Sequence, residues 1–160
     1  MSRRTKTTRS REPRRSIRQL ERALARLTTV APPEDVVRER AHALLTHLAG
    51  VKLPILIANN RARYVDVNAA AAAATGYTRQ ELLRMHLWDL TPIPNRALGG
   101  RLWRAFLRRG RMTGRYALRR RDGSIVEADY LAVANVLPGV HVSALSVVKQ
   151  RRSAALRARR

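Results

Sequence analysis

The stretch LPILIANNRARYVDVNAAAAAATGYTRQELL, residues 53–83, determines how the rest of this 160-residue sequence can be placed. It opens with an apolar run at 53–58 and continues with a β-branched and aromatic run at 63–67. The four residues between them are polar or tolerant of turns, and this pattern is typical of two strands joined as a β-hairpin.

Two short helices are predicted after the hairpin. Asn68 precedes six consecutive alanines, and its side chain can accept a hydrogen bond from an N–H group in the first turn of a helix. Gly76 suits the end of that helix because glycine tolerates positive φ. Thr78 and Glu81 have the spacing of a capping box, which predicts the start of a second helix.

This region resembles the start of a PAS domain, whose pattern is a hydrophobic strand, Asn, a short Ala-containing helix, Gly-Tyr and Ser/Thr-x-x-Glu-Leu. Residues 87–90, Leu-Trp-Asp-Leu, resemble the segment before that family's long connecting helix, and residues 120–124, Arg-Arg-Asp-Gly-Ser, resemble its hairpin turn. The resemblance covers roughly Val51 to Val148. The residues that match the first motif are Val67, Asn68, Ala70, Ala71, Gly76, Tyr77, Thr78, Glu81 and Leu82.

The rest of the sequence agrees with such a domain. A helix is predicted over 95–110, where the family has its connecting helix, and three strands between 112 and 148 are separated by turns at Asp122-Gly123 and Pro138-Gly139. The predicted fold class is therefore α+β. It has a PAS-like five-stranded antiparallel sheet with short helices on one face, preceded by amphipathic N-terminal helices.

The N-terminal segment predicts a dimer. We expect a disordered basic tail at 1–14, N-terminal helices at 15–50, the PAS-like domain at 51–148 and a basic C-terminal helix stub at 149–160. A short heptad seam favours a homodimer through these helices, as does the resemblance, because PAS domains commonly carry such helices at a dimer interface. The seam consists of Ile17, Leu20, Leu24 and Leu27.

Positive charge is in large excess, with 33 Lys and Arg against 11 Asp and Glu, a net charge of +22. Residues 96–121 hold ten arginines and no acidic residue. This stripe could contact phosphates of nucleic acid without sequence preference, although charge runs are usually solvated faces. The candidate contacts are Arg101, Arg104, Arg108, Arg109, Arg111, Arg119, Arg120 and Arg121.

The cofactor is unknown from the sequence. There is no cysteine, so disulfides, the cysteinyl flavin adduct and the cysteine-linked chromophore of some PAS proteins are excluded. The resemblance disfavours haem, since haem-binding PAS domains usually place the axial histidine on the connecting helix or its neighbours and residues 95–110 contain none. His86 is the candidate ligand if haem binds, His141 is expected at the surface or in packing, and non-covalent flavin stays open.

Neither an enzyme nor a membrane protein is predicted. The six carboxylates of the core are expected on separate turns and solvent-facing strand positions, with no metal-binding cluster. The charge-free run 130–148 is expected to be a hairpin and not a membrane span. A cytoplasmic location is the default for a chain without cysteine.

A small apolar or amphipathic ligand is a better-supported expectation. The alanines at 69–74 either open space over the sheet or let their helix pack closer, and both readings stay open. Aromatic residues are candidates for a pocket wall, although in a small domain they are more often ordinary core. They are Trp88, Trp103, Phe106, Tyr116 and Tyr130.

The resemblance therefore implies a sensory or regulatory module. It would bind a small ligand or a protein partner and relay the signal through dimerisation or partner contacts, in signal transduction and regulation of transcription. The alternative is a basic nucleic-acid-associated protein that uses the same fold as a scaffold.

Overall fold

The computed structural model describes residues 18–24, 30–92 and 96–148. Several predictions fall outside these ranges. They concern the tail at 1–14, the stub at 149–160, the helix cap at Asn95 and the seam residues Ile17 and Leu27.

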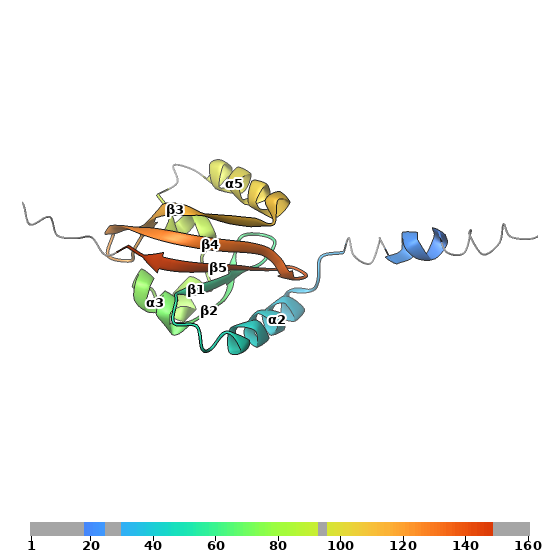
Figure 1. Ribbon diagram of the computed structural model, residues 1–160, viewed down its shortest axis with the longest axis horizontal. Coiled ribbons are helices and arrows are strands. Elements are labelled where there is room, and N and C mark those ends of the chain that lie inside the picture. The colour runs from blue at the N-terminus through green and yellow to red at the C-terminus, as the bar shows by residue number, and fades with distance from the viewer. Residues whose placement is uncertain (1–17, 25–29, 93–95, 149–160) are drawn as a thin grey trace, which may run out of the picture. The chain divides into compact units, whose positions relative to one another are not determined.

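The chain divides into two compact units, residues 1–31 and 32–160. In the first unit, residues 18–24 form a helix on which the side chains of Leu20 and Leu24 are both exposed. The second unit holds the sheet and the remaining described helices (Figure 1). Within the described residues, no helix is both long enough and apolar enough to cross a bilayer.

The sheet has five strands in the order β2-β1-β5-β4-β3, and every neighbouring pair is antiparallel. The predicted five-stranded antiparallel sheet is thereby confirmed, and the run 130–148 lies in the β4–β5 hairpin. The strands are β1 (Ile55–Ala58), β2 (Tyr64–Val67), β3 (Arg111–Arg119), β4 (Ile125–Leu137) and β5 (Val140–Val147).

The two short helices after the β1–β2 hairpin have the caps that the sequence predicts. Asn68 accepts a hydrogen bond from the Ala71 N–H, and Gly76 adopts φ 79° at the helix end. Thr78 and Glu81 form both hydrogen bonds of the capping box. The described helices of this unit are α2 (Glu34–His47), α3 (Ala69–Thr75), α4 (Arg79–Leu82), the 3-10 turn η1 (Leu87–Leu90) and α5 (Arg96–Arg109).

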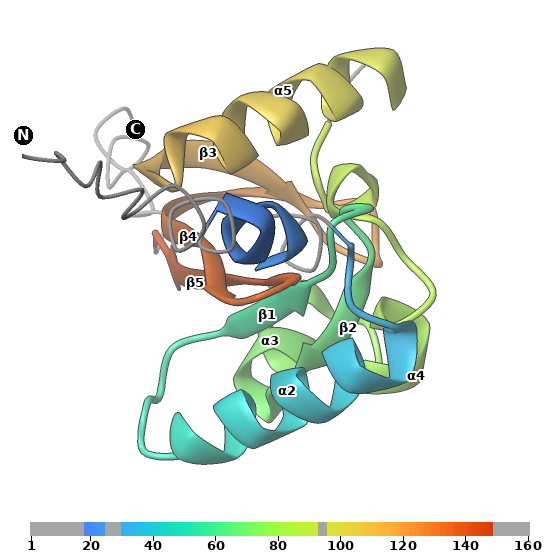
Figure 2. The same ribbon diagram turned by 90° about the vertical axis from the view of Figure 1, so that its right-hand side faces the viewer.

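The two faces of the sheet are covered by different helices. We call inner the face that carries Leu56, Leu118 and Leu145, which pack in one core cluster with residues of α3, α4, η1 and α5. The outer face of β1, β2 and β5 is covered by α2, with Ile57 and Val140 fully buried against it. Figure 2 shows α5 at the β3 end of the sheet and α2, α3 and α4 at the β1–β2 end.

A register shift in the β1–β2 pair decides which side chains of β2 face inward. Ala58 is paired with Tyr64, whereas the next residue back, Ile57, is paired with Asp66. Val65 is therefore an extra residue, and such a bulge interrupts the simple alternation of side chains. Tyr64 consequently joins the inner core, while Val65 packs with the outer cluster and Asp66 faces α2.

Candidate functional site

An apolar pocket of about 380 Å³ lies between the inner face of the sheet and α5. It receives side chains from all five strands, from α5 and from the segment between η1 and α5. Among the described residues that line it there is no Lys, Arg, His, Asp or Glu. The lining consists of Leu56, Tyr64, Leu87, Thr91, Pro92, Gly99, Leu102, Trp103, Phe106, Met112, Tyr116, Ala117, Tyr130, Ala132, Ser143 and Leu145.

Four of the five aromatic residues singled out in the sequence meet at this pocket. Trp103 and Phe106 come from adjacent turns of α5, with ring centroids 5.1 Å apart. Tyr116 and Tyr130 come from β3 and β4, with centroids 5.4 Å apart in an edge-to-face arrangement. These pairs place an aromatic surface on both the helix side and the sheet side of the same space.

Trp88 is the exception, since it is not among the lining residues. Its ring packs beneath α5 so closely that a Cβ atom added at Gly99 would lie 2.9 Å from Trp88 Cε3. The Trp88 ring also stacks on His86, with ring centroids 5.0 Å apart. Among the described residues, the buried Trp88 Nε1 has no hydrogen-bond partner.

The alanine helix α3 does not border the pocket either. Ala71 is fully buried in the inner core, and none of the six alanines is among the lining residues. Of the two readings left open by the sequence, the structure therefore supports close packing of the helix.

Sequence reasoning missed Tyr64, which is 5% exposed and lines the pocket beside the predicted residues. Burial raises the pKa of the Tyr64 hydroxyl well above its ordinary value, and the nearby Tyr116 adds to the shift. Burial likewise raises the pKa of Tyr116, with a smaller contribution from Tyr130. Strict alternation along β2 predicts that Tyr64 and Asp66 point to the same face of the sheet. The bulge at Val65 places them on opposite faces.

His141 is a buried packing residue, 2% exposed, beside Trp103 and Phe106. Its Nδ1 accepts the N–H of Asn135, so its Nε2 carries the proton and donates to Asn60 Oδ1 at 2.9 Å. Burial lowers the pKa of His141 to about 4. Both ring nitrogens are thus occupied, and the neutral ring has none left for a metal.

His86 lies outside the pocket lining, stacked on Trp88, with Nδ1 3.9 Å from Asp89 Oδ2. Within the described ranges, no group of three or more His, Asp or Glu side chains is arranged to hold a metal ion.

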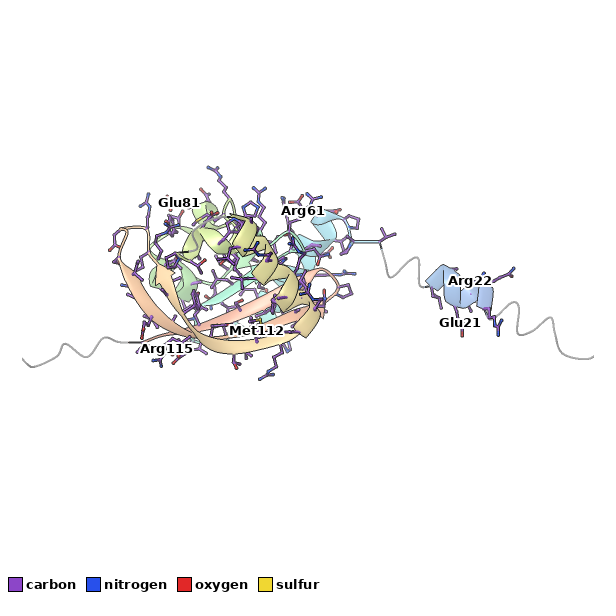
Figure 3. The ribbon with its side chains drawn as sticks, turned by 90° about the horizontal axis from the view of Figure 1, so that it is seen from above. Glu21, Arg22, Arg61, Glu81, Met112 and Arg115 are labelled. Atoms are coloured by element: carbon purple, nitrogen blue, oxygen red, sulfur yellow. The ribbon has the colours of Figure 1, made fainter. Side chains whose placement is uncertain are left out.

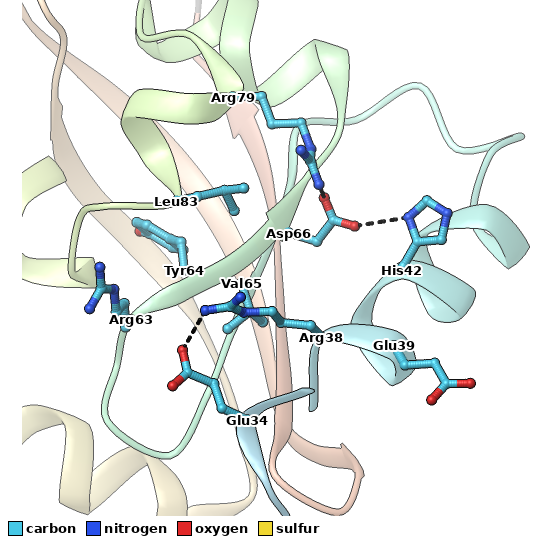
Figure 4. A pocket seen from close by; sticks show the side chains of 10 residues that line it. All are labelled: Glu34, Arg38, Glu39, His42, Arg63, Tyr64, Val65, Asp66, Arg79 and Leu83. Carbon is cyan, nitrogen blue, oxygen red and sulfur yellow. Dashed lines mark hydrogen bonds and ion pairs between the residues drawn. The ribbon is translucent and has the colours of Figure 1, made fainter. Parts of the chain in front are cut away.

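A second, polar pocket of about 450 Å³ lies between α2, β2 and α4 (Figure 4). Its centre is Asp66, which is 2% exposed, so the expectation that every core carboxylate is on a turn or faces solvent was wrong. Asp66 Oδ1 accepts hydrogen bonds from Arg79 Nε and Nη2 at 3.0 and 2.9 Å, and from the Val67 N–H. Asp66 Oδ2 faces His42 Nδ1 of α2 at 3.4 Å.

Seven of the eight arginines of the predicted basic stripe separate into two groups, and the eighth, Arg111, is the first residue of β3. Three of the seven are bonded within the fold: Arg119 donates to the Asp89 carbonyl, Arg120 to the Ala74 carbonyl, and Arg121 pairs with Glu81 at 2.8 Å. The α5 group is exposed and has no carboxylate partner among the described residues. It consists of Arg101, Arg104, Arg108 and Arg109.

Adjacent residues of a strand point to opposite faces of the sheet, so Arg115 and Tyr116 of β3 (Arg111–Arg119) lie on different sides. Arg115 is labelled in Figure 3. Arg115 pairs with Asp129 on the exposed side at 2.7 Å, whereas Tyr116 lines the pocket. The charged and apolar surfaces of this hairpin are thereby kept apart.

The comparisons with known proteins agree with this architecture. A family model described as PAS domain matches residues 52–148. No curated protein matches significantly.

Three solved structures with the same fold illustrate the likeness. A PAS domain from Desulfitobacterium hafniense is 20% identical, covering 63% of this chain and 97% of its own, with a TM-score of 0.58. A domain of a sensory box sensor histidine kinase/response regulator from Geobacter sulfurreducens is 23% identical, with coverage of 66% and 92% and a TM-score of 0.52. The PAS domain of a LuxR-family transcriptional regulator from Burkholderia thailandensis, solved in complex with ethanol, is 16% identical, with coverage of 61% and 90% and a TM-score of 0.51.

The family match spans more than half of the chain, and the sheet order, the helix caps and the pocket under α5 all lie inside it. The chain belongs to the PAS domain family.

Proposed function

We propose that this chain is a sensory module that binds a small molecule in the apolar pocket under α5 and passes the signal to α2 and the segment before it. The observation that carries the proposal is that strands β1 and β5 border the pocket with one face and contact α2 with the other. Leu56 of β1 and Leu145 of β5 line the pocket, while Ile57 of β1 and Val140 of β5 pack against α2 on the outer face.

This arrangement provides a mechanical route from ligand to helix. Adjacent residues of a strand point to opposite faces, so a ligand that moves β1 or β5 also moves the surface on which α2 rests. A ligand can shift an equilibrium between two positions of α2 only by binding one of them more tightly. Signal output would then pass through dimerisation or a partner protein, with regulation of transcription as the expected process.

The relatives provide a limited parallel. One domain of this fold belongs to a sensory box sensor histidine kinase/response regulator, and a PAS domain from a transcriptional regulator was solved with ethanol. Both are below 25% identity, so they support the fold, and the ligand and output assigned to this chain rest on its own pocket and strands.

Native mass spectrometry of freshly purified protein, followed by hydrogen exchange with and without a bound compound, tests the proposal. We expect saturable binding of one molecule and altered exchange of the α2 amides, residues 34–47. Ala132→Leu, which fills the pocket from β4, should abolish both effects. Ala43→Leu on the exposed face of α2 is the matched control and should preserve both. Binding that leaves α2 exchange unchanged would contradict the relay.

A second candidate function is favoured by the exposed arginines of α5. Arg101, Arg104 and Arg108 recur at spacings of three and four, which places them along one side of the helix, where they could contact successive phosphates of a nucleic acid. Each phosphate contact steepens the fall of log K with log salt by about 0.9 on duplex DNA.

The triple variant R101A/R104A/R108A should therefore flatten the salt dependence of duplex DNA binding. The control variant R115A/R119A/R121A removes the same charge from arginines that already have partners in the fold. If both triple variants change the slope equally, the binding reflects net charge and not an α5 surface.

A further inference from the structure

The pocket under α5 brings three phenol hydroxyls into a mainly apolar lining, in which Thr91 and Ser143 also carry hydroxyl groups. Tyr64, Tyr116 and Tyr130 all line it, from β2, β3 and β4. The Tyr116 and Tyr130 rings touch edge to face at 5.4 Å, and Tyr64 and Tyr116 lie close enough to influence each other's ionisation. Tyr116 and Tyr130 are thus neighbours on β3 and β4, and Tyr64 enters the same pocket from β2 at the other edge of the sheet.

The position of Tyr130 is set by a glycine on the neighbouring strand. Gly114 is paired directly with Tyr130 across β3 and β4, and the Tyr130 ring lies over it. A Cβ atom at position 114 would lie 3.3 Å from Tyr130 Cε1 and 3.5 Å from its hydroxyl oxygen. The absence of a side chain at Gly114 therefore lets the ring lie across β3 next to Tyr116.

No hydrogen bond joins any of the three hydroxyls to another group in the part of the chain that the structure describes, and none of the three oxygens is a fully buried atom without a partner, so the hydroxyls open onto the pocket space. A ligand that covers such a hydroxyl removes it from water, and the free energy of the lost hydration is recovered only if the ligand offers an acceptor. Burial also keeps the phenols of Tyr64 and Tyr116 neutral, since it raises the pKa of both. The neutral hydroxyls of Tyr64 and Tyr116 can therefore donate a hydrogen bond to a ligand that carries an acceptor.

We propose that the pocket selects an uncharged, mainly aromatic or apolar molecule that carries a hydrogen-bond acceptor such as a carbonyl oxygen, and that Tyr64, Tyr116 and Tyr130 supply the donors. This inference rests on the proposed ligand-binding function and specifies the class of ligand. Trp103 and Phe106 of α5 would cover the apolar body of the molecule from the other side.

Charged ligands are disfavoured by the same lining. An anion would lose its hydration without gaining a cationic partner, because no Lys, Arg or His is among the described lining residues. An organic cation would find aromatic faces, which attract cations, but no carboxylate, and it would enter a chain whose net charge is already +22. The neutral molecule is the class for which the pocket provides both apolar contact and polar partners.

A matched set of naphthalene compounds tests the proposal by calorimetric titration of the full chain. The set is 2-acetonaphthone, which has a carbonyl acceptor; 2-isopropenylnaphthalene, in which a CH₂ group replaces that oxygen; the anion 2-naphthoate; and the cation 2-naphthyltrimethylammonium. We expect the ketone to bind about tenfold more tightly than the hydrocarbon, as one hydrogen bond gained in an apolar site would provide. Both ions should bind more weakly than the ketone.

Tyrosine-to-phenylalanine variants show whether the hydroxyls cause this preference. The triple variant Y64F/Y116F/Y130F should lose the tenfold preference for the ketone and keep its affinity for the hydrocarbon, because only the hydroxyls are removed. Tyr77→Phe is the control, since Tyr77 packs against the inner core but does not line the pocket. A urea unfolding curve of each variant establishes that it is folded.

The outcomes separate this inference from the proposed function. Equal affinity for ketone and hydrocarbon, an unchanged preference in the triple variant, or tightest binding of either ion would overturn the ligand class while leaving a ligand-binding pocket. Binding of none of the four compounds would overturn both proposals.

Discussion

Asp66 shows how one residue can join three elements. Its carboxylate is buried on β2, held by Arg79 of α4 and faced by His42 of α2. Because a buried carboxylate that loses its partner is left with an uncompensated charge, the Arg79→Ala variant should be less stable. The Arg79 side chain is 53% exposed, so solvent screens the pair and we expect a loss of about 1–2 kcal/mol in the free energy of unfolding, measured in urea.

Two further variants isolate this interaction. Arg84→Ala removes an exposed arginine just after α4 and should change the stability little. In an Asp66→Asn background, Arg79→Ala should also lower the free energy of unfolding only slightly, because position 66 then carries no charge that needs a partner. Equal losses from Arg79→Ala in both backgrounds would show that the side chain acts through something other than Asp66.

His141 predicts a pH dependence of stability. Burial holds its folded pKa at about 4, below the ordinary value of 6.5, so between these values the unfolded chain binds more protons than the folded one. The contribution of neutral His141 is therefore complete above about pH 6.5 and lost as the pH falls towards 4, where the difference reaches about 3 kcal/mol.

His141→Asn separates this effect from the titration of carboxylates. The amide oxygen can replace Nδ1 as the acceptor for the Asn135 N–H, but asparagine does not titrate. Urea unfolding at several pH values should give the variant a shallower loss of stability between pH 6.5 and 4 than the wild type. Parallel profiles would show that His141 does not gain protons on unfolding in this range.

At the scale of elements, the contact between α5 and η1 depends on Gly99, and its neighbour Gly100 lies outside that contact. A methyl group at Gly99 would lie 2.9 Å from the Trp88 ring, whereas one at Gly100 would meet only the end of Arg104 at 3.6 Å. Gly99→Ala should therefore destabilise the fold by about 1–3 kcal/mol through overpacking. Gly100→Ala should stabilise it by roughly 0.5–1 kcal/mol, because alanine is the better helix former.

Thermal or urea unfolding of the two variants gives opposite signs if this contact is correct. Because Gly99 also lines the pocket, its variant should bind the naphthyl ketone more weakly, and the Gly100 variant should bind it as the wild type does. The same sign of change in both variants would show that α5 does not rest on Trp88 at this point.

Helix caps and turns could be predicted from the sequence, because their hydrogen bonds and backbone angles depend on residues close together in the chain. The Asn68 cap, the positive φ of Gly76 and the Thr78–Glu81 capping box depend on residues at most a few positions apart, and the structure has all of them. Gly123 likewise adopts φ 83° in the predicted turn between β3 and β4.

The parts that were missed depend on contacts between distant segments. The bulge at Val65 is defined by pairing with β1, so alternation along β2 alone could not show that Tyr64 faces inward and Asp66 outward. Trp88 was expected to line the pocket, but its place beneath Gly99 depends on how α5 crosses η1. Four of the predicted aromatic residues meet because their strands and helix are paired as the family resemblance implied.

At the scale of the whole molecule, the net charge of +22 acts in opposite directions on the two associations proposed for this chain. Two copies repel each other, so salt should strengthen a dimer by screening that repulsion. Binding of a polyanion should weaken with salt, since counterions compete for the arginines. The sign of the salt dependence therefore distinguishes self-association from nucleic-acid binding in the same preparation.

We propose the helix at residues 18–24 as the contact of a homodimer, because Leu20 and Leu24 occupy a predicted heptad seam and are 59% and 52% exposed. Leu20→Lys should convert the dimer to a monomer in sedimentation velocity at moderate salt, since it places a charge in an apolar seam. Glu21→Lys changes the charge on the same turn without removing an apolar side chain and should leave a dimer that tightens with salt. If Leu20→Lys sediments as the wild type does, association must use another surface, for which the outer face around α2 is the next region to test.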